Sequence, residues 1–230
     1  SNSAKHRVVK REFLKTADGS LTIHLPDWDE QYHSKHGAIQ ESKHVFIKTG
    51  LHHFCELHDV EKLAILEIGF GTGLNALLTS QEAEILNRSI LYDGVEAYPI
   101  SLQQVQGLNY PEMLGITETS FLKLHSVSWE TPQEITPSFT LHKKQKLFKD
   151  ITAIDAYHLI YFDAFGARVQ PELWTQEVFK TMHAALKQDG VLVTYAAKGS
   201  VRRAMQAVGF TVERLPGPPG KREMLRATKV

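Results

Sequence analysis

The segment "AILEIGFGTGLN", residues 64–75, constrains the fold of this chain more than any other. Its apolar run predicts a buried strand, and Gly69, Gly71 and Gly73 follow at alternate positions. Glycines let the backbone turn sharply and let a ligand approach it closely. Because open parallel sheets bind ligands at the carboxyl ends of their strands, the segment predicts an α/β protein with a ligand-binding loop.

Strands and helices are expected to alternate along the rest of the chain. The expected strands are 62–69, 89–97, 139–148, 156–165 and 191–197, and the expected helices are 73–88, 99–109 with Pro99 near its first turn, 170–190 closed by Gly190, and 200–209. This order predicts a mostly parallel sheet with right-handed crossovers. Two final strands, 210–215 and 222–228, have no helix between them, so we expect an antiparallel hairpin at one edge.

The N-terminal part has a different pattern. Residues 12–25 contain Asp-Gly between two runs of β-formers, which predicts a β-hairpin. Residues 26–42 are rich in polar residues and are expected to form a loop, and 43–58 have helical spacing with Gly50 as a weak point. We therefore predict an N-terminal hairpin and loop extension, residues 1–42, and an α/β domain, residues 43–230.

Composition excludes several classes of protein. The 230 residues carry 26 basic and 26 acidic side chains, and the single Cys55 excludes an internal disulfide or a cysteine metal site. No metal is expected. No apolar run is long enough to span a membrane, and no secretory signal is visible, so a cytoplasmic protein is expected. From residue 198 onward the chain has eight Lys or Arg residues and only two acidic residues. This local excess of positive charge predicts either a solvated basic surface or a surface that binds a polyanion.

The glycine spacing favours one cofactor over another. The dinucleotide fingerprint is G-x-G-x-x-G, whereas this chain has G-x-G-x-G with Glu67 two residues earlier. The pattern resembles motif I of S-adenosylmethionine-dependent methyltransferases, in which an acid can receive the cationic end of the cofactor. Glu96 ends the next strand and can accept hydrogen bonds from a ribose. Asp150 is either a partner for the adenine amino group or a helix N-cap.

The fourth strand of the α/β part ends in Asp163, and Phe165 follows. An alkylamine is mostly protonated near neutral pH, so its methylation needs a group that accepts the proton. Asp163 is the candidate catalytic residue for that step. Phe165 can stack on a planar base.

Several separated segments resemble one family: "YHSKHGAIQESKHVFI", "EIGFGTGLN", "GVEAYP", "YFDAFGARVQPELWT", "GVLVTYAAKGSVRRAMQAVGF" and "GPPGKREML". Together, from Tyr32 to Arg226, they look like the methyltransferase domain of MnmC, the bacterial tRNA wobble-uridine modification family, in a free-standing form. The resemblance implies a class I, Rossmann-like methyltransferase fold. It also implies methyl transfer from S-adenosylmethionine to the amine of 5-aminomethyl(-2-thio)uridine at the wobble position of tRNA.

The same resemblance assigns roles to residues. The candidates for cofactor binding are Glu67, Gly69, Phe70, Gly71, Thr72, Gly73, Asn75, Glu96 and Asp150. The candidates for substrate binding are Tyr32, Glu41, Phe165, Arg202, Arg203, Lys221, Arg222 and Glu223. With this assignment, the C-terminal basic residues are expected to contact the tRNA backbone.

Two departures leave alternatives open. The family commonly has Asp-Gly-Phe-Ala-Pro where this chain has Asp163-Ala-Phe-Gly-Ala167. The flavin oxidase domain of the bifunctional enzyme is absent from this sequence, so either a separate enzyme supplies the amine or the substrate differs. The alternatives are a methyltransferase for a small-molecule or protein amine, and a non-catalytic RNA-binding module on the same fold. An NAD-dependent enzyme ranks last.

Overall fold

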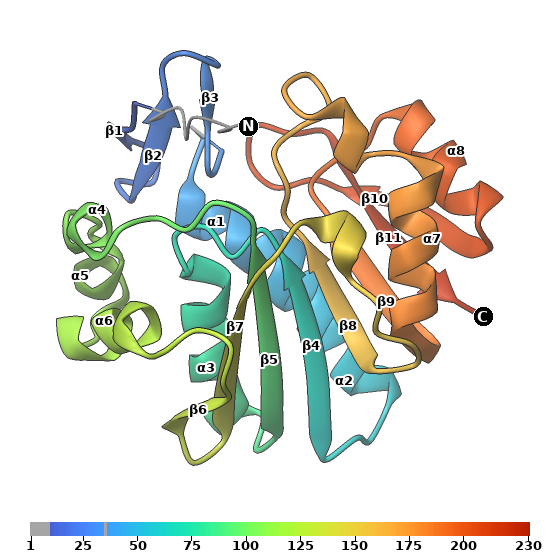
Figure 1. Ribbon diagram of the computed structural model, residues 1–230, viewed down its shortest axis with the longest axis horizontal. Helices are drawn as coiled ribbons and strands as arrows, with labels where there is room; N and C mark the ends of the chain where they lie inside the picture. The colour runs from blue at the N-terminus through green and yellow to red at the C-terminus, as the bar shows by residue number, and fades with distance from the viewer. Residues whose placement is uncertain (1–9, 35) are drawn as a thin grey trace, which may run out of the picture.

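The large sheet has eight strands in the order β10-β11-β9-β8-β4-β5-β7-β6 in a computed structural model that describes residues 10–34 and 36–230 (Figure 1). Its strands are β4 Lys62–Ile68, β5 Ser89–Glu96, β6 Gln133–Thr136, β7 Phe139–Gln145, β8 Tyr157–Phe162, β9 Leu186–Thr194, β10 Phe210–Pro216 and β11 Glu223–Lys229. The five strands β4, β5, β7, β8 and β9 are parallel. The C-terminal hairpin β10–β11 is antiparallel and forms one edge, so the predicted α/β class and edge hairpin are confirmed.

Helices cover both faces of this sheet. The helices are α1 Ala38–Ser42, the π-helix η1 Lys43–His52, α2 His53–Leu57, α3 Leu74–Ile85, α4 Leu102–Gln106, α5 Tyr110–Leu114, α6 Glu118–Ser126, α7 Gln176–Ala185 and α8 Gly199–Ala207, with 3-10 turns η2 Phe148–Asp150 and η3 Pro171–Leu173. Alternate residues of β4 reach opposite faces: Ile65 packs with η1 and α3, whereas Leu66 packs with α7 and α8. The fold is therefore a three-layer helix–sheet–helix arrangement.

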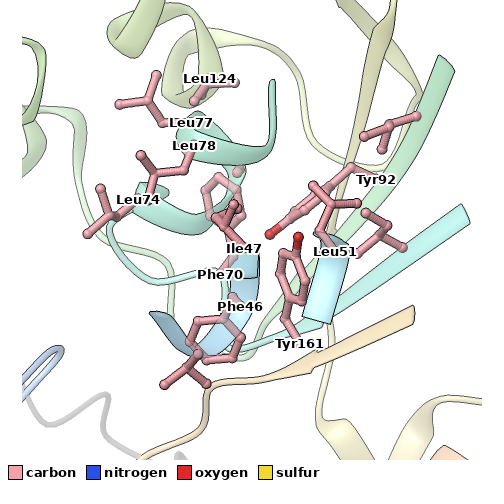
Figure 2. Close-up of a cluster of buried hydrophobic side chains, with 14 of the residues drawn as sticks. Phe46, Ile47, Leu51, Phe70, Leu74, Leu77, Leu78, Tyr92, Leu124 and Tyr161 are labelled. Atoms are coloured by element: carbon pink, nitrogen blue, oxygen red, sulfur yellow. The ribbon is translucent and has the colours of Figure 1, made fainter. Parts of the chain in front are cut away.

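The face toward η1 and α3 carries most of the aromatic core. Figure 2 shows Phe46 and Leu51 from η1, and Leu74 and Leu77 from α3, in the same cluster as Tyr161 from β8. The Tyr161 hydroxyl is satisfied inside this core by Thr79 Oγ1 at 3.0 Å. Packing of this kind fixes α3, whose first turn carries part of the predicted cofactor motif.

The order in which the chain adds strands reverses at the β4–β8 pair. After β4 the chain adds β5 and β7 on one side, whereas β8 and β9 lie on the other. Ligands bind in such sheets at this switch point. The two predicted motifs end these two adjacent strands, because Gly69 follows β4 and Asp163 follows β8.

The N-terminal hairpin is confirmed and is larger than predicted. β1 Glu12–Lys15 and β2 Leu21–Leu25 pair across Asp18-Gly19, and β3 Glu30–Gln31 adds a third strand. The prediction of a loop over 26–42 was wrong at β3 and at α1. Helix α1 starts at Ala38 because the hairpin turn caps it: Thr16 Oγ1 accepts from Ala38 N at 3.1 Å, and Asp18 Oδ2 accepts from Gln40 N at 3.1 Å. Residues 1–9 of the predicted extension lie outside the described residues.

Several details of the helices and strands differ from the predictions. Gly50 does not interrupt a helix, because η1 runs through it and the absence of a side chain lets the Val193 side chain approach. Helix α7 ends at Ala185 rather than at Gly190, since Leu186 already pairs with Tyr157 of β8. Pro99 precedes α4, which begins after Ser101 because Ser101 and Gln104 form a capping box.

Candidate active site

A cavity of about 1530 Å³ opens at the carboxyl ends of the parallel strands. Gly69 follows β4, Glu96 ends β5, Asp163 follows β8 and Tyr195 follows β9, and all four line it. A further wall comes from the N-terminal part of the chain: Leu25, Trp28, Glu30, Gln31, Tyr32, His33, Ser34 and His36. The site therefore lies between the carboxyl ends of the parallel strands and the small sheet β1–β3, which is drawn above the large sheet in Figure 1.

The glycine loop fits closely between strand ends. Gly69 has φ +90°, and a Cβ there would collide with the Asp163 carbonyl oxygen. Its N–H donates to Val95 O at 3.0 Å. Gly71 N donates to Glu96 Oε1 at 2.9 Å and lies against the ring of Tyr32. Only glycine meets both the positive φ and the close approach at position 69.

The other loop residues face away from the cavity and support the loop from behind. Phe70 is buried against His125 and Trp129. The Thr72 carbonyl accepts from His125 Nε2 at 2.8 Å, and Thr72 Oγ1 lies 3.2 Å from His33 Nε2. Gly73 precedes α3 in a left-handed conformation. These contacts hold the loop to α6 and to the N-terminal segment.

Asn75 links the buried carboxyl group of Glu67 to the half-buried carboxyl group of Asp163. Its Nδ2 donates to Glu67 Oε2 at 2.8 Å and to Asp163 Oδ2 at 2.9 Å. Glu67 is 1% exposed and does not line the large cavity, so its predicted contact with the cationic end of a cofactor has no direct path in this geometry. Burial, and then the charge of Asp163, raise the pKa of Glu67 well above its usual range.

Asp163 faces the cavity beside two further charged groups. Burial, and then the charge of Glu41, raise the pKa of Asp163 well above its usual range, whereas Asn75 and Lys221 act to lower it. Lys221 Nζ lies 2.9 Å from Glu41 Oε2. A carboxyl group with a raised pKa accepts a proton near neutral pH better than an ordinary aspartate does.

Glu96 occupies the position predicted for a ribose partner. Its two oxygens accept from the backbone N–H groups of Gly71 at 2.9 Å and Tyr98 at 3.3 Å. Each carboxylate oxygen can accept a second hydrogen bond, so the group is oriented and still able to bind hydroxyls.

Aromatic side chains form the opposite wall. The ring of Phe165 lies 4.9 Å from that of Tyr32 and 5.9 Å from that of Trp28, measured between centroids, in edge-to-face contacts. Trp174 Nε1 donates to the Phe165 carbonyl at 2.7 Å and holds the loop after β8. The loop lacks the family's proline, and these contacts restrain it instead.

The structure leaves some predicted residues outside the cavity. Asp150 is exposed and does not line the cavity, and because η2 ends at this residue it is not an N-cap. Its contact with adenine stays a prediction. Arg203 and Arg222 are exposed and Arg202 is half-buried. These three, together with Glu223, do not line the cavity, although Lys221 does.

Sequence reasoning missed several residues of the cavity wall, Tyr195 and Trp28 among them. Tyr195 lies under the ammonium of Lys221, 4.0 Å from Nζ to the ring centre, and Trp28 packs on Phe165. Tyr195 lies near the carboxyl end of the predicted strand 191–197, so the rule that sites form at strand ends could have found it. Trp28 lies in a segment with no periodic pattern, and nothing in the sequence connects it to the site.

Comparisons with known proteins agree with this geometry. Residues 133–230 match a family model described as "S-adenosyl-L-methionine-dependent methyltransferase". The chain is 30% identical, over 91% of its length, to the tRNA 5-methylaminomethyl-2-thiouridine biosynthesis bifunctional protein MnmC of Pseudomonas syringae pv. syringae. The resemblance to the MnmC family is confirmed. The chain covers 35% of that relative, and 33% of the MnmC protein of Actinobacillus pleuropneumoniae, to which it is 28% identical over 88% of this chain.

Solved structures support the fold. A crystal structure of MNMC2 from Aquifex aeolicus matches with a TM-score of 0.79 at 23% identity, over 98% of this chain and 72% of that chain. Spermidine synthase from Thermotoga maritima matches with a TM-score of 0.65 at 14% identity, over 97% and 70%. The predicted methyltransferase fold is confirmed, and the predicted cofactor is the one that the description of the matching family model names.

Residues 10–34 and 36–230 lack two further features. None of the helices among them is long and apolar enough to cross a membrane. The same residues contain no group of three or more His, Cys, Asp or Glu side chains that could hold a metal ion.

Proposed function

We propose that this protein transfers a methyl group from S-adenosylmethionine to the primary amine of 5-aminomethyl(-2-thio)uridine at the wobble position of tRNA. The observation that carries the proposal is the position of Asp163, a half-buried carboxyl group at the β4–β8 switch point, beside a glycine loop. The names of the MnmC relatives support the choice of tRNA as substrate.

The cavity fits the proposed cofactor by charge and by shape. Acidic side chains line it, among them Glu41, Glu96 and Asp163, which suits a cofactor with a sulfonium and an ammonium group. The cradle at Gly69 and Gly71 has no room for larger side chains, so backbone forms the surface that the ligand would meet. We assign Gly69, Gly71 and Glu96 to cofactor binding.

The chemistry then depends on proton transfer and alignment. S-adenosylmethionine supplies an electrophilic methyl group, and an amine attacks it only with a free lone pair. Asp163 accepts the ammonium proton, and Asn75 holds its carboxyl group in place by the 2.9 Å hydrogen bond. Phe165 and Tyr32 present aromatic faces on which a uracil ring can stack.

Charged residues near the mouth support a tRNA contact. Of the eight C-terminal cations, Lys221, Arg226 and Lys229 form ion pairs with carboxylates of the same chain. The other five have no carboxylate partner among the described residues: Lys198, Arg202, Arg203, Arg214 and Arg222. We propose that these five contact tRNA phosphates.

The proposal has two further consequences. Methyl transfer consumes a free amine that it does not make, so we propose that a separate activity supplies that amine. A tRNA substrate also fits a cytoplasmic location, which we propose for this protein.

Labelled S-adenosylmethionine and two tRNA pools test the proposal. One pool is rich in 5-aminomethyluridine and the other is unmodified. We expect label only in 5-methylaminomethyluridine from the first pool, identified by mass after nucleoside separation. Label in a free amine or a protein, with none in either tRNA pool, would support the small-molecule alternative instead. Absence of cofactor binding would support the non-catalytic alternative.

A further inference from the structure

The side chain of Lys221 projects into the candidate active site. Its ammonium nitrogen lies 2.9 Å from Glu41 Oε2 and 4.0 Å from the centre of the Tyr195 ring. A carboxylate and an aromatic face together make a strong site for an organic cation. The chain therefore places one of its own primary ammonium groups in a site that is built for such a group.

The side chains of Glu41 and Tyr195 are held in place by hydrogen bonds, whereas the side chain of Lys221 is free to reach solvent. The Glu41 side chain is 4% exposed, and its second oxygen accepts from Ser34 N at 3.2 Å. The Tyr195 hydroxyl donates to the Ala164 carbonyl at 2.7 Å, which fixes the ring. The Lys221 side chain is 30% exposed, so it has a path to solvent.

The loop that carries Lys221 does not need to move for its side chain to leave. Lys221 N donates to Pro218 O at 2.9 Å, and Gly217 N donates to Arg222 O at 3.1 Å. Gly220 packs directly against His36. The lysine stem has four flexible carbons, so rotation within it is enough to withdraw the ammonium.

The ammonium position is also within electrostatic reach of the candidate base. Glu41 and Lys221 shift the pKa of Asp163 in opposite directions, and all three side chains line the same cavity. An amine that took the place of the Lys221 ammonium would lie near Asp163.

We propose that Glu41 and Tyr195 form a subsite for a primary alkylammonium ion, which the Lys221 side chain occupies until an amine ligand replaces it. This inference rests on the proposed function only in taking the ligand to be an amine. It specifies how the substrate is recognised: as the charged ammonium, before its proton is removed.

The test measures binding of methylammonium chloride by calorimetry at constant ionic strength, without cofactor or tRNA. The variant is Lys221→Met, which removes the competing charge and keeps a side chain of similar length. We expect it to bind methylammonium at least tenfold more tightly than the wild-type protein. The control Lys62→Met changes an exposed lysine at the amino end of β4 and should leave the affinity unchanged.

A second change identifies the subsite. Adding Glu41→Gln to Lys221→Met should remove the gained affinity. If Lys221→Met fails to fold, Lys221→Gln keeps a hydrogen-bond donor toward Glu41 and is measured in its place. Equal affinity in the wild-type protein and the lysine variant would overturn the proposal and make Lys221–Glu41 a permanent ion pair. That result would leave methyl transfer to tRNA untouched, because the experiment contains neither substrate.

Discussion

At the scale of single residues, the site depends on carboxyl groups whose pKa is raised by burial. Glu67 and Asp163 share one amide group of Asn75. The charge of Asp163 raises the pKa of Glu67, and the Asn75 hydrogen bond acts to lower the pKa of both acids. Two carboxyl groups that share one hydrogen-bond donor in a poorly solvated site do not both ionise easily. We infer that Asp163 is held ready to take up a proton, with Asn75 as its positioning residue.

Replacing Asp163 by Asn tests its role as the base. Asp163→Asn keeps the size of the side chain and an oxygen for the Asn75 hydrogen bond, but it cannot accept the substrate proton. We expect turnover to fall by roughly 100-fold or more, with cofactor affinity nearly unchanged. The control is Asp59→Asn, at an exposed position before β4. Equal losses of cofactor binding and turnover would show that Asp163 is structural.

Glu67 predicts a pH dependence of stability. Its pKa is raised in the folded protein from the ordinary value of 4.5, so its contribution to stability is complete below that value and is lost as pH rises through the higher folded pKa. The Glu67→Gln side chain stays neutral at every pH. The free energy of unfolding of this variant, relative to that of the wild-type protein, should therefore be higher at pH 8 than at pH 4. Urea unfolding at both pH values measures this. The exposed Glu61→Gln serves as control, and a pH-independent difference at position 67 would contradict the expectation.

At the scale of elements, close approach between loops decides which residues are possible. The loop after β4 touches the loop after β8 at Gly69, and the hairpin turn at residues 16–20 caps α1. In both places, a segment contacts the backbone of another segment that is not its neighbour in the sequence. The start of α1 and the need for glycine at position 69 therefore depend on both segments together, and neither segment determines them alone.

Gly69→Ala tests the contact between the two strand ends. A Cβ at this position meets the Asp163 carbonyl, and φ is +90°, so both a clash and backbone strain result. The matched control is Gly115→Ala, with φ +66° and nothing within 4 Å of its Cβ, which isolates the strain at about 1–2 kcal/mol. We expect Gly69→Ala to lower the free energy of unfolding by more than the control and to weaken cofactor binding. Equal effects in chemical denaturation would show that the loop accommodates the methyl group.

At the scale of the whole molecule, the N-terminal part of the chain and the turn between β10 and β11 both lie at the carboxyl ends of the parallel strands. Trp28, Tyr32 and Lys221 line the same cavity as Gly69 and Asp163. His33 joins the layers, with Nδ1 2.8 Å from Thr22 Oγ1 and Nε2 3.2 Å from Thr72 Oγ1. The division of the chain at residue 42 stays a prediction, and several of the described residues before it line the site.

The proposed contact of Arg202 and Arg203 with tRNA predicts how tRNA affinity depends on salt concentration. Reversing the charge of Arg202 and Arg203 to Glu should weaken tRNA binding more at low salt than at high salt. The slope of log affinity against log salt should fall by about one for each phosphate that the variant no longer neutralises. The control reverses Lys48 and Lys62, which are exposed away from the cavity. An unchanged slope would remove α8 from the tRNA interface.

The sequence by itself determined the α/β class, the edge hairpin, the glycine loop and the acid after β8. These features follow from local periodicity and from residue types that a turn or a strand end requires. Only the tertiary structure decided that Asn75 joins Glu67 to Asp163, that Tyr195 lies under Lys221, and that Asp150 stays outside the cavity. The physical reason is distance along the chain. Glu41 and Lys221 are 180 positions apart, and no local pattern records a contact that only packing creates.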